Sequence, residues 1–366
     1  MLILTIFCFT LLGIQIIYFS LFLFAFAKEN KSVVGNPKPV SVIVCAHDEE
    51  QNLRELVPLL LAQHHPEFEV IIVEDRCNDG TYDYLLAATR EDPRLKMVRV
   101  VHKPDHISGK KFALTLGIKA AQYDWVLLTD ADCRPVSKHW INHMNERMDE
   151  ETQIVLGFSP YFKSKGLLNT FIRFESILTG IQFIGFAILG RPYMGVGRNL
   201  AYRKSLFIDN KGFNSHLGVI GGDDDLFVNE YATGSTTRIS LGPETLVKSV
   251  PKTTWKEYNV QKLRHYSVGK HYKFSDKLML GIFSLTWLLT DLLVLPVSLF
   301  NPHMEWILPT FLLRWILLIY LFHVTSRKLG EPFEAWKTPI LDFIYAFYYL
   351  VTGLKALVSK KVRWKS

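Results

Sequence analysis

The sequence of 366 residues contains only four cysteines, and none of them forms a C-x-x-C pair with another. Cysteines this scattered predict neither a zinc site nor a disulfide framework. The chain also lacks a glycine period, a long heptad run and any low-complexity tract, while aromatic residues make up 13% of it. These absences exclude collagen-like, coiled-coil and largely disordered proteins.

Charge is absent from the first 27 residues, and a second apolar concentration fills the last ninety. The first run is longer than the core of a secretory signal peptide, although Ala25-Phe26-Ala27 resembles a signal cleavage site. Lys28, Lys31 and Lys38 follow the run, and no positive residue precedes it. The positive-inside rule therefore predicts an uncleaved anchor over residues 1–27, with the N-terminus outside and the following residues in the cytoplasm. A cleaved signal peptide is the alternative.

The net charge of +7 lies largely beside apolar segments and is accompanied by no nucleic-acid recognition motif. Anionic lipid headgroups therefore match it better than nucleic acid does. We expect an integral membrane protein that binds no nucleic acid, and we infer no obligate protein partner.

Short β-branched runs alternate with helical stretches from Pro39 onward. We expect strands near residues 40–44, 70–73, 96–101 and 125–129, and helices near residues 49–63, 79–90 and 110–121. This pattern predicts βαβ units and a mostly parallel sheet. Ligands gather at the carboxyl ends of the strands in such sheets. The acidic residues that follow the predicted strands are Asp48 and Glu49, Glu74 and Asp75, and Asp130 and Asp132.

Three apolar segments lie in the last third of the chain, near residues 278–300, 306–323 and 340–358. The first two predict a transmembrane hairpin, because the turn between them has no Lys or Arg. We expect the third to lie in the inner leaflet, since a true span, the alternative, would place the basic tail at 360–365 outside. An earlier uncharged run, residues 176–190, is too short for a span and predicts an interfacial or buried helix.

Asp291 and Arg314 are the charged residues within the two apolar segments of the predicted hairpin, 278–300 and 306–323. Asp291 lies twelve residues before His303 in the turn and Arg314 lies eleven after it, so the two should sit at nearly equal depth. We expect them to form an ion pair, because a charge within a membrane usually finds a partner. The alternative is that Arg314 extends to the headgroups of one leaflet.

Two acidic sites are candidates for chemistry. Asp130 and Asp132 form a D-x-D pattern after a predicted buried strand, and such paired carboxylates can hold a hard divalent cation that bridges phosphates. Asp223, Asp224 and Asp225 form the second site, after two glycines. Their repulsion predicts one carboxylate near a cation, one that is hydrogen-bonded and one whose raised pKa lets it take a proton. The alternatives are a solvated turn for the first site and an acidic helix N-terminus for the second.

Two basic segments complete the candidate residues. Lys110 and Lys111 stand at a predicted helix start, where an ammonium and backbone N–H groups suit a phosphate. Gln261, Arg264 and His265 share one face of a later predicted helix. A membrane-surface helix is the alternative for that segment.

Together these segments resemble the membrane-anchored family 2 glycosyltransferases of GT-A fold, the group that includes cellulose and chitin synthases and ceramide glucosyltransferase. The resemblance covers residues 39–275, and its motifs stand in the family's order at residues 42–50, 74–81, 109–110, 130–132, 197–203, 223–224 and 261–265. It implies an α/β, Rossmann-like GT-A domain with a mostly parallel sheet over residues 28–276. Around it we expect the anchor at 1–27, a transmembrane hairpin at 277–325, and a final segment at 326–366. That final segment comprises a cytoplasmic loop, an interfacial or third C-terminal membrane helix, and the basic tail.

The resemblance also implies roles for individual residues. Those implied to bind the donor are Ala46, Asp48, Glu49, Asp75, Lys110, Asp130, Gln261 and Arg264. Asp132, with Asp130, is implied to hold Mg²⁺ or Mn²⁺. Asp224 is implied to be the catalytic base. If the three aspartates are aligned differently with the family's E-D pair, Asp223 is the base instead. Those implied to lie on the acceptor side are Asn199, His265 and Asp225.

The chain departs from the family pattern at three of these positions. His265 replaces the Trp that supports the acceptor sugar in processive synthases, which argues against a long polymer. Asp223 replaces the Glu of the family's E-D pair, and Asp48 stands where Asn is usual. The second departure leaves the choice between Asp223 and Asp224 as base open.

We therefore expect a metal-dependent, inverting glycosyltransferase of the hexosyltransferase type, with its catalytic domain on the cytoplasmic side of a bacterial inner membrane and a product in a cell-envelope glycan. The expected donor is a nucleotide-diphosphate sugar such as a UDP-sugar. The expected acceptor is a lipid or lipid-linked glycan, because membrane segments flank the catalytic domain on both sides. A processive polysaccharide synthase is the first alternative, and a non-catalytic nucleotide-sugar-binding scaffold of a membrane complex is an alternative of another class.

Overall fold

The computed structural model describes residues 2–28, 36–105 and 107–358. The chain forms two compact units, each assembled from segments that are distant in sequence. The sheet unit comprises Asn30–Phe162 and Ala187–Pro251, and the helical unit comprises Met1–Glu29, Lys163–Phe186 and Lys252–Ser366. The sheet unit is thus smaller than residues 28–276, because two segments of that range pack with the apolar helices.

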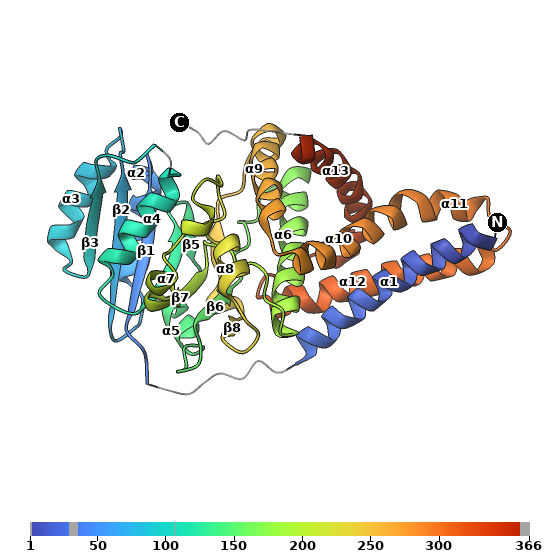
Figure 1. The fold of residues 1–366 in the computed structure, drawn as a ribbon, viewed down its shortest axis with the longest axis horizontal. Helices are drawn as coiled ribbons and strands as arrows, with labels where there is room; N and C mark the ends of the chain where they lie inside the picture. The colour runs from blue at the N-terminus through green and yellow to red at the C-terminus, as the bar shows by residue number, and fades with distance from the viewer. Residues whose placement is uncertain (1, 29–35, 106, 359–366) are drawn as a thin grey trace. The chain divides into compact units, whose positions relative to one another are not determined.

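A seven-stranded sheet forms the centre of the sheet unit (Figure 1). Its strands are β1 (Val40–Ala46), β2 (Phe68–Asp75), β3 (Leu95–Val100), β4 (Trp125–Asp130), β6 (Ile154–Gly157), β7 (Leu200–Arg203) and β8 (Thr237–Ser240). They are arranged in the order β3-β2-β1-β4-β7-β6-β8, and neighbours are parallel except that β7 runs antiparallel to β4 and β6. β5 (Cys133–Pro135) and β9 (Val247–Ser249) pair separately. The predicted mostly parallel sheet is confirmed.

The helices between the first four strands lie where the sequence predicts them. They are α2 (Glu50–Leu61), α3 (Thr81–Glu91) and α4 (Gly109–Ala120), and the shorter α5 (Trp140–Asn145), α7 (Lys204–Asp209) and α8 (Asp225–Tyr231) follow. Successive strand residues point to opposite faces, so Val42 and Val44 join Leu53 of α2 in one core while Ile43 faces α4. A Cβ added at Gly117 of α4 would lie 2.7 Å from Ile43 Cγ2. This close packing fixes α4, and with it the position of its first turn.

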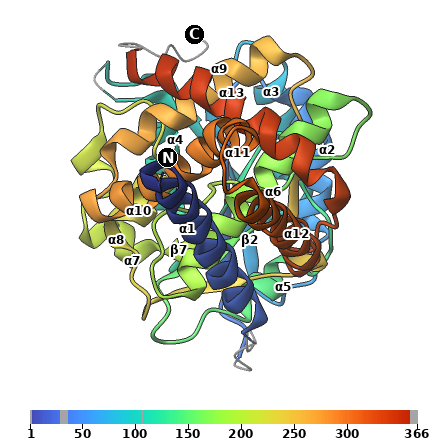
Figure 2. The same ribbon diagram turned by 90° about the vertical axis from the view of Figure 1, so that its right-hand side faces the viewer.

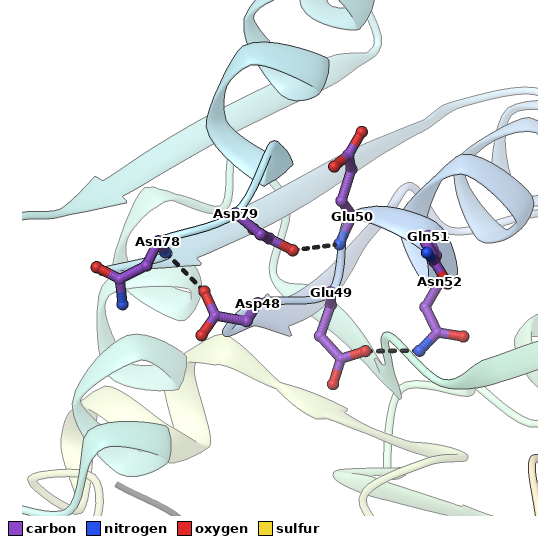
Figure 3. A pocket seen from close by; sticks show the side chains of 7 residues that line it. All are labelled: Asp48, Glu49, Glu50, Gln51, Asn52, Asn78 and Asp79. Carbon is purple, nitrogen blue, oxygen red and sulfur yellow. Dashed lines mark hydrogen bonds between the residues drawn. The ribbon is translucent and has the colours of Figure 1, made fainter.

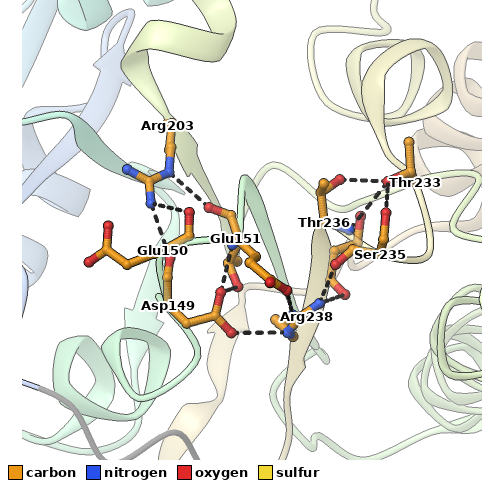
Figure 4. A network of polar contacts seen from close by, with 10 residues as sticks. Asp149, Glu150, Glu151, Arg203, Thr233, Ser235, Thr236 and Arg238 are labelled. Carbon is orange, nitrogen blue, oxygen red and sulfur yellow. Dashed lines mark hydrogen bonds and ion pairs between the residues drawn. The ribbon is translucent and has the colours of Figure 1, made fainter.

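A polar network closes the sheet at the edge where β4 begins (Figure 4). Arg203, which pairs with Trp125 in the register of β7 and β4, donates to the carbonyl oxygens of Thr152 at 2.8 Å and Asp149 at 3.1 Å. Arg238 of β8 reaches the Asp149 carboxylate at 3.3 Å. These contacts hold the turn before β6 against β7 and β8. The network therefore stabilises the edge of the sheet that lies away from the strand carboxyl ends.

The helical unit contains the long apolar helices. Its helices are α1 (Leu2–Ala27), α6 (Leu167–Ile188), α9 (Trp255–Val268), α10 (Phe274–Leu289), α11 (Leu295–Leu299), α12 (Met304–Lys328) and α13 (Thr338–Val358). α1 packs beside α10 and α12, which are arms of the predicted hairpin (Figures 1 and 2).

Among the described residues, four helices are long and apolar enough to cross a membrane: Leu2–Ala27, Leu167–Ile188, Phe274–Leu299 and Met304–Lys328. In α6 the apolar stretch is 78% buried inside the protein, against 33% in each of the other three. The expectation that the run at residues 176–190 is too short for a span is wrong, because α6 begins at Leu167 and is 22 residues long. Its burial inside the protein agrees with the predicted buried helix.

α13 confirms that residues 340–358 are helical. Whether this helix lies in the interface or crosses the membrane stays a prediction, and so does the orientation of the chain. Lys31 and the basic tail at 360–365 lie outside the described residues.

The predicted pair between Asp291 and Arg314 is confirmed. Arg314 Nη1 lies 3.1 Å from Asp291 Oδ1, and its Nη2 lies 3.2 Å from Asp291 Oδ2. Asp342 of α13, which sequence reasoning did not identify, accepts from Arg314 Nη1 at 2.7 Å. All three side chains are fully buried, and a π-helical turn over Thr290–Val294 presents Asp291. The triad joins α12, α13 and the turn between α10 and α11.

Breaking this triad should destabilise the protein strongly. Arg314→Leu leaves two buried carboxylates without their cation, and we expect a loss of roughly 3–5 kcal/mol in the free energy of unfolding. Asp291→Asn or Asp342→Asn added to that variant should each restore part of the loss. Thermal unfolding in native-like lipid measures both effects, with Lys328→Leu at the exposed end of α12 as the control. Strictly additive losses would contradict the ionic contact.

Candidate active site

Three parallel strands end side by side at one edge of the sheet. In the strand register Ala46 of β1 faces Glu74 of β2, and Cys45 of β1 faces Asp130 of β4. The acidic residues that follow the strands are therefore brought to the same edge, as the sequence predicts. Lys110 reaches this edge from the first turn of α4.

Asp75 at the end of β2 is buried and paired with its neighbour. Arg76 Nε lies 2.7 Å from Asp75 Oδ1, and Arg76 Nη2 lies 3.2 Å from Asp75 Oδ2. A Cβ at Gly109 would come within 3.2 Å of Asp75 Oδ2 and 3.0 Å of Arg76 Nη2. Glycine at this position thus lets the start of α4 approach the carboxylate. Sequence reasoning missed Arg76, which follows directly after a strand-end acid.

A polar pocket lies beside this point, between the loops that follow β1 and β2 (Figure 3). The backbone N–H of Asn78 donates to Asp48 Oδ1 at 2.6 Å, and that of Glu50 donates to Asp79 Oδ2 at 3.1 Å. Glu49 Oε2 accepts from the Asn52 amide at 2.6 Å. Asp48 adopts a left-handed conformation with a φ of 55°, which turns the loop toward β2. The loops are therefore preorganised by their own acidic side chains.

Ala46 precedes this pocket as the last residue of β1 and is buried. Its carbonyl oxygen accepts from the Cys77 thiol at 3.4 Å. The end of β1 is thereby tied to the loop after β2.

Lys110 lies between carboxylates from two distant segments. Its Nζ is 3.0 Å from Asp130 Oδ1 and 3.1 Å from Asp223 Oδ2. Burial alone would lower the pKa of Lys110, but the negative charges of Asp130, Asp223 and Asp224 raise it well above the ordinary value. Lys110 is therefore a permanent cation that links the end of β4 to the segment before α8.

Asp130 and Asp132 fit a hard divalent cation. One oxygen of each carboxylate and the sulfur of Cys133 lie within 4.8 Å of one another. Burial raises the pKa of the Cys133 thiol well above its usual range, and this thiol donates to Asp132 Oδ1 at 3.4 Å. The two carboxylates supply oxygen ligands, which are the ligands that Mg²⁺ and Mn²⁺ prefer.

Asp223 and Asp224 are adjacent but differ in environment. Burial would raise the pKa of Asp223, yet the charge and hydrogen bond of Lys110 outweigh it and lower that pKa. Asp224 lacks such a contact, and burial together with the charge of Asp223 raises its pKa. The predicted separation of roles among the three carboxylates thus has a physical basis: Asp223 neighbours the cation and Asp224 has the raised pKa.

The backbone holds the Asp224 carboxylate in place. Its Oδ2 accepts from the N–H of Gly197 at 2.7 Å, and its Oδ1 accepts from the N–H of Asp225 at 2.8 Å. A Cβ at Gly197 would lie 3.2 Å from both Cβ and Oδ2 of Asp224. Asp224 is thereby the N-cap of α8. Asp225 is the first residue of that helix, and its Oδ1 accepts from the N–H of Leu226 at 2.9 Å.

Asn199 is buried behind this site. Its side chain accepts from Trp140 Nε1 at 2.9 Å and donates to the carbonyl oxygens of Phe158 and Thr245, each at 2.8 Å. Any acceptor-side role for Asn199 would therefore act through the segments that it positions.

Arg198, which sequence reasoning did not single out, is a further cation of this region. Burial would lower its pKa, but Tyr161, Cys133, Asp130 and Asp132 together raise it. Its position inside the motif at 197–203 was the signal that could have found it.

Gln261, Arg264 and His265 lie on α9, which belongs to the helical unit. α9 is fixed to α6 through Glu175, a buried carboxylate that contacts Tyr258, Lys262 at 2.7 Å and Tyr266 at 3.2 Å. The expected donor and acceptor contacts of Gln261, Arg264 and His265 stay predictions.

Comparison with known proteins shows a similarity to glycosyltransferases over part of the chain. Residues 41–210 match glycosyl transferase family 2. The probable glycosyltransferase YdaM of Bacillus subtilis is 28% identical over 245 residues, which cover 64% of this chain and 55% of that protein. Poly-beta-1,6-N-acetyl-D-glucosamine synthase of Staphylococcus epidermidis is 28% identical over 105 residues, or 29% of this chain and 23% of that protein. The chain thus spans about half the length of the first relative and less of the second.

A solved structure shows the same fold. The mannosyltransferase PcManGT from Pyrobaculum calidifontis, solved in complex with GDP-Man and Mn²⁺, superposes with a TM-score of 0.63 at 17% identity, covering 96% of this chain and 97% of that one. The sheet unit therefore has the GT-A fold predicted from the sequence.

Removing the Lys110 cation should destabilise this site in a pH-dependent way. Asp223 has a lowered pKa in the folded state, so its contact with Lys110 contributes stability above the unfolded pKa and loses it on acidification. In Lys110→Met the carboxylates repel without compensation, and we expect a loss of roughly 1–3 kcal/mol near neutral pH, since Lys110 is partly exposed.

Because the uncompensated carboxylates of this variant take up protons on acidification, its deficit should shrink between about pH 7 and about pH 5. Thermal unfolding of wild type, Lys110→Met and the exposed control Lys119→Met at both pH values measures the effect. An equal deficit at both values would show that the cation does not compensate these carboxylates.

Proposed function

We propose that the protein is an inverting glycosyltransferase that transfers a sugar from a nucleotide-diphosphate donor, such as a UDP-sugar, to a lipid or lipid-linked glycan. The observation that carries the proposal is the position of Lys110 between Asp130 and Asp223, next to the half-buried Asp224. A phosphate-binding cation, a metal-binding pair and a potential base thus meet at the carboxyl edge of one sheet.

The donor would occupy the strand ends. Asp75 and the loop that contains Asp48 and Glu49 would hold the nucleoside, and Lys110 would donate to the diphosphate. Asp132 and Asp130 would hold Mg²⁺ or Mn²⁺, which when bound neutralises charge on a departing diphosphate. The complex of PcManGT with GDP-Man and Mn²⁺ supports a donor and metal of this kind.

Asp224 would act as the base. Its raised pKa and its two backbone hydrogen bonds leave it able to take the proton of an acceptor hydroxyl. The acceptor oxygen then attacks the anomeric carbon on the face opposite the leaving diphosphate, and the configuration inverts. Gln261 and Arg264 would add hydrogen bonds to the phosphates, while His265 and Asp225 would lie on the acceptor side.

The membrane setting favours a lipid-linked acceptor. The apolar helices described above would anchor the enzyme, with the sheet unit on the cytoplasmic side of a bacterial inner membrane. The relative from Staphylococcus epidermidis is named a polysaccharide synthase, so processive synthesis is the second candidate function. The absence of Trp at position 265 argues for transfer of single sugars.

The direct test is turnover of a panel of nucleotide sugars by the protein in native lipid. We expect hydrolysis or transfer from one donor that requires Mg²⁺ or Mn²⁺, stops with EDTA, and is lost in Asp132→Ala. Asp79→Ala, in the acidic group formed by Asp48, Cys77 and Asp79, is the matched control and should keep its metal dependence. A folded protein that neither binds nor turns over any donor would favour the non-catalytic scaffold.

Variants of the acidic pair test the base. Asp224→Asn should leave donor binding within about twofold while transfer falls by roughly 10²–10⁴-fold, because general base catalysis is lost. Substantial residual transfer would exclude Asp224 as base.

Asp223→Asn distinguishes the two candidates for the catalytic base, Asp224 and Asp223. If Asp224 is the base, its raised pKa sets the acid limb of kcat/KM, and activity rises as the pH rises through that pKa. Removing the neighbouring charge of Asp223 should then move the limb to lower pH while activity persists. Loss of transfer in Asp223→Asn with full activity in Asp224→Asn would assign the base to Asp223.

A further inference from the structure

Lys111 is a buried cation that the proposed chemistry does not use. Consecutive residues of a helix point about 100° apart, so Lys110 and Lys111 face different surroundings at the start of α4. Lys111 is only 1% exposed, and its Nζ donates to the carbonyl oxygen of His216 at 2.5 Å and to that of Val219 at 2.9 Å. The predicted phosphate contact therefore does not apply to Lys111, because its ammonium is directed into the protein.

Both acceptors belong to one loop, residues 214–222, which leads directly into Asp223 and Asp224. The loop lies between α7 and α8 and ends in Gly221 and Gly222, whose φ values are 86° and 75°. Two successive left-handed residues strongly favour glycine, and they turn the chain from the loop into Asp223 and Asp224. Contacts that hold the loop therefore act directly before Asp223 and Asp224, in addition to the contacts with Lys110 and with the N–H of Gly197.

The loop also contacts Glu230 of α8 through Ser215 and His216. Ser215 Oγ donates to Glu230 Oε2 at 2.5 Å on the exposed side of α8. Lys111 instead makes two charge-assisted hydrogen bonds in a buried place, where such bonds are strongest. Burial lowers the pKa of Lys111 to about 8 despite the nearby charges of Asp223, Asp225 and Asp224, so the ammonium form still predominates near neutral pH. His216 faces the same ammonium and has a pKa lowered to about 4 by burial and by Lys111, so it stays neutral there.

We propose that Lys111 is a positioning residue for Asp223 and Asp224. Its ammonium donates to the carbonyl oxygens of His216 and Val219 and so fixes the loop at residues 214–222. The fixed loop in turn holds the two carboxylates where sugar transfer requires them. The proposal rests on the proposed glycosyltransferase function for its kinetic consequence. Its structural part, the clamping of residues 214–222, does not depend on that function. Lys111 itself touches neither donor nor acceptor in this scheme.

Lys111→Met tests the proposal, because methionine has a similar length and cannot donate. We expect amide hydrogen exchange in residues 214–222 to accelerate by roughly tenfold or more, while exchange in β1 and β4 is unchanged. Transfer should fall by roughly 10- to 100-fold in kcat, since a displacement of about 1 Å has this effect, with the KM for the donor within about twofold. Lys119→Met, on the exposed side of the same helix, should match the wild type in both measurements.

Two further variants keep the proposal open to refutation if Lys111→Met folds poorly. Lys111→Arg retains the donors and should restore part of kcat and of the protection of the loop. Ser215→Ala removes the exposed contact and should show the same pattern with a smaller amplitude.

Unchanged exchange of residues 214–222 in a folded Lys111→Met would overturn the proposal, and so would accelerated exchange with unchanged kcat. If the wild type turns over no sugar nucleotide, the proposed function fails and the kinetic consequence fails with it. The exchange measurement still decides whether Lys111 clamps the loop.

Discussion

The ammonium of Lys110 is the contact on which the active-site edge depends. Asp130 comes from the end of β4 and Asp223 from the segment before α8, and both lie about 3 Å from this one nitrogen. Without a cation between them, these carboxylates and Asp224 would repel one another in a partly buried place. Lys110 can occupy that place because α4 packs closely on β1 and β2 at Gly117, which fixes its first turn. The packing of an apolar helix face thus determines where a charge is held.

The same arrangement separates two adjacent aspartates chemically. Asp223 is stabilised as an anion by Lys110, and its charge in turn raises the pKa of Asp224. Neighbouring carboxylates with opposite pKa shifts are a general sign that one remains charged while the other exchanges a proton. The backbone N–H groups of Gly197 and Asp225 orient the Asp224 carboxylate. Their hydrogen bonds lower its pKa less than burial and the charge of Asp223 raise it. Geometry and charge therefore distinguish two residues that the sequence alone leaves equivalent.

The parts of the structure that the sequence predicts are those that follow from local pattern. β1, β2 and β4 are apolar runs that are buried on both faces, so their positions and parallel pairing could be read directly. Asp291 and Arg314 could be paired because a hairpin relates residues at equal distances from its turn. Asp342 could not be found in this way, since its contact with Arg314 depends on how α13 packs against α12. The same limit applies to Lys111: a lysine at a helix start suggests an anion, and only the path of a distant loop shows that it binds two carbonyl oxygens.

Buried polar contacts also join the helices of the helical unit. Arg314 joins three segments, and α13 is joined in turn to α9 by the hydrogen bond from Tyr348 to Asn259 at 2.8 Å. Lys270, in the turn after α9, donates to the carbonyl oxygen of Ala356 in α13 at 2.7 Å. Glu175 of α6 holds the other side of α9. Apolar contacts between helices have little directional preference, whereas a buried carboxylate or guanidinium has few alternative partners. Hydrogen bonds to α6 and α13 therefore fix the rotation of α9 about its axis more than the apolar surface that these helices share. That rotation decides the direction in which Gln261 and Arg264 point.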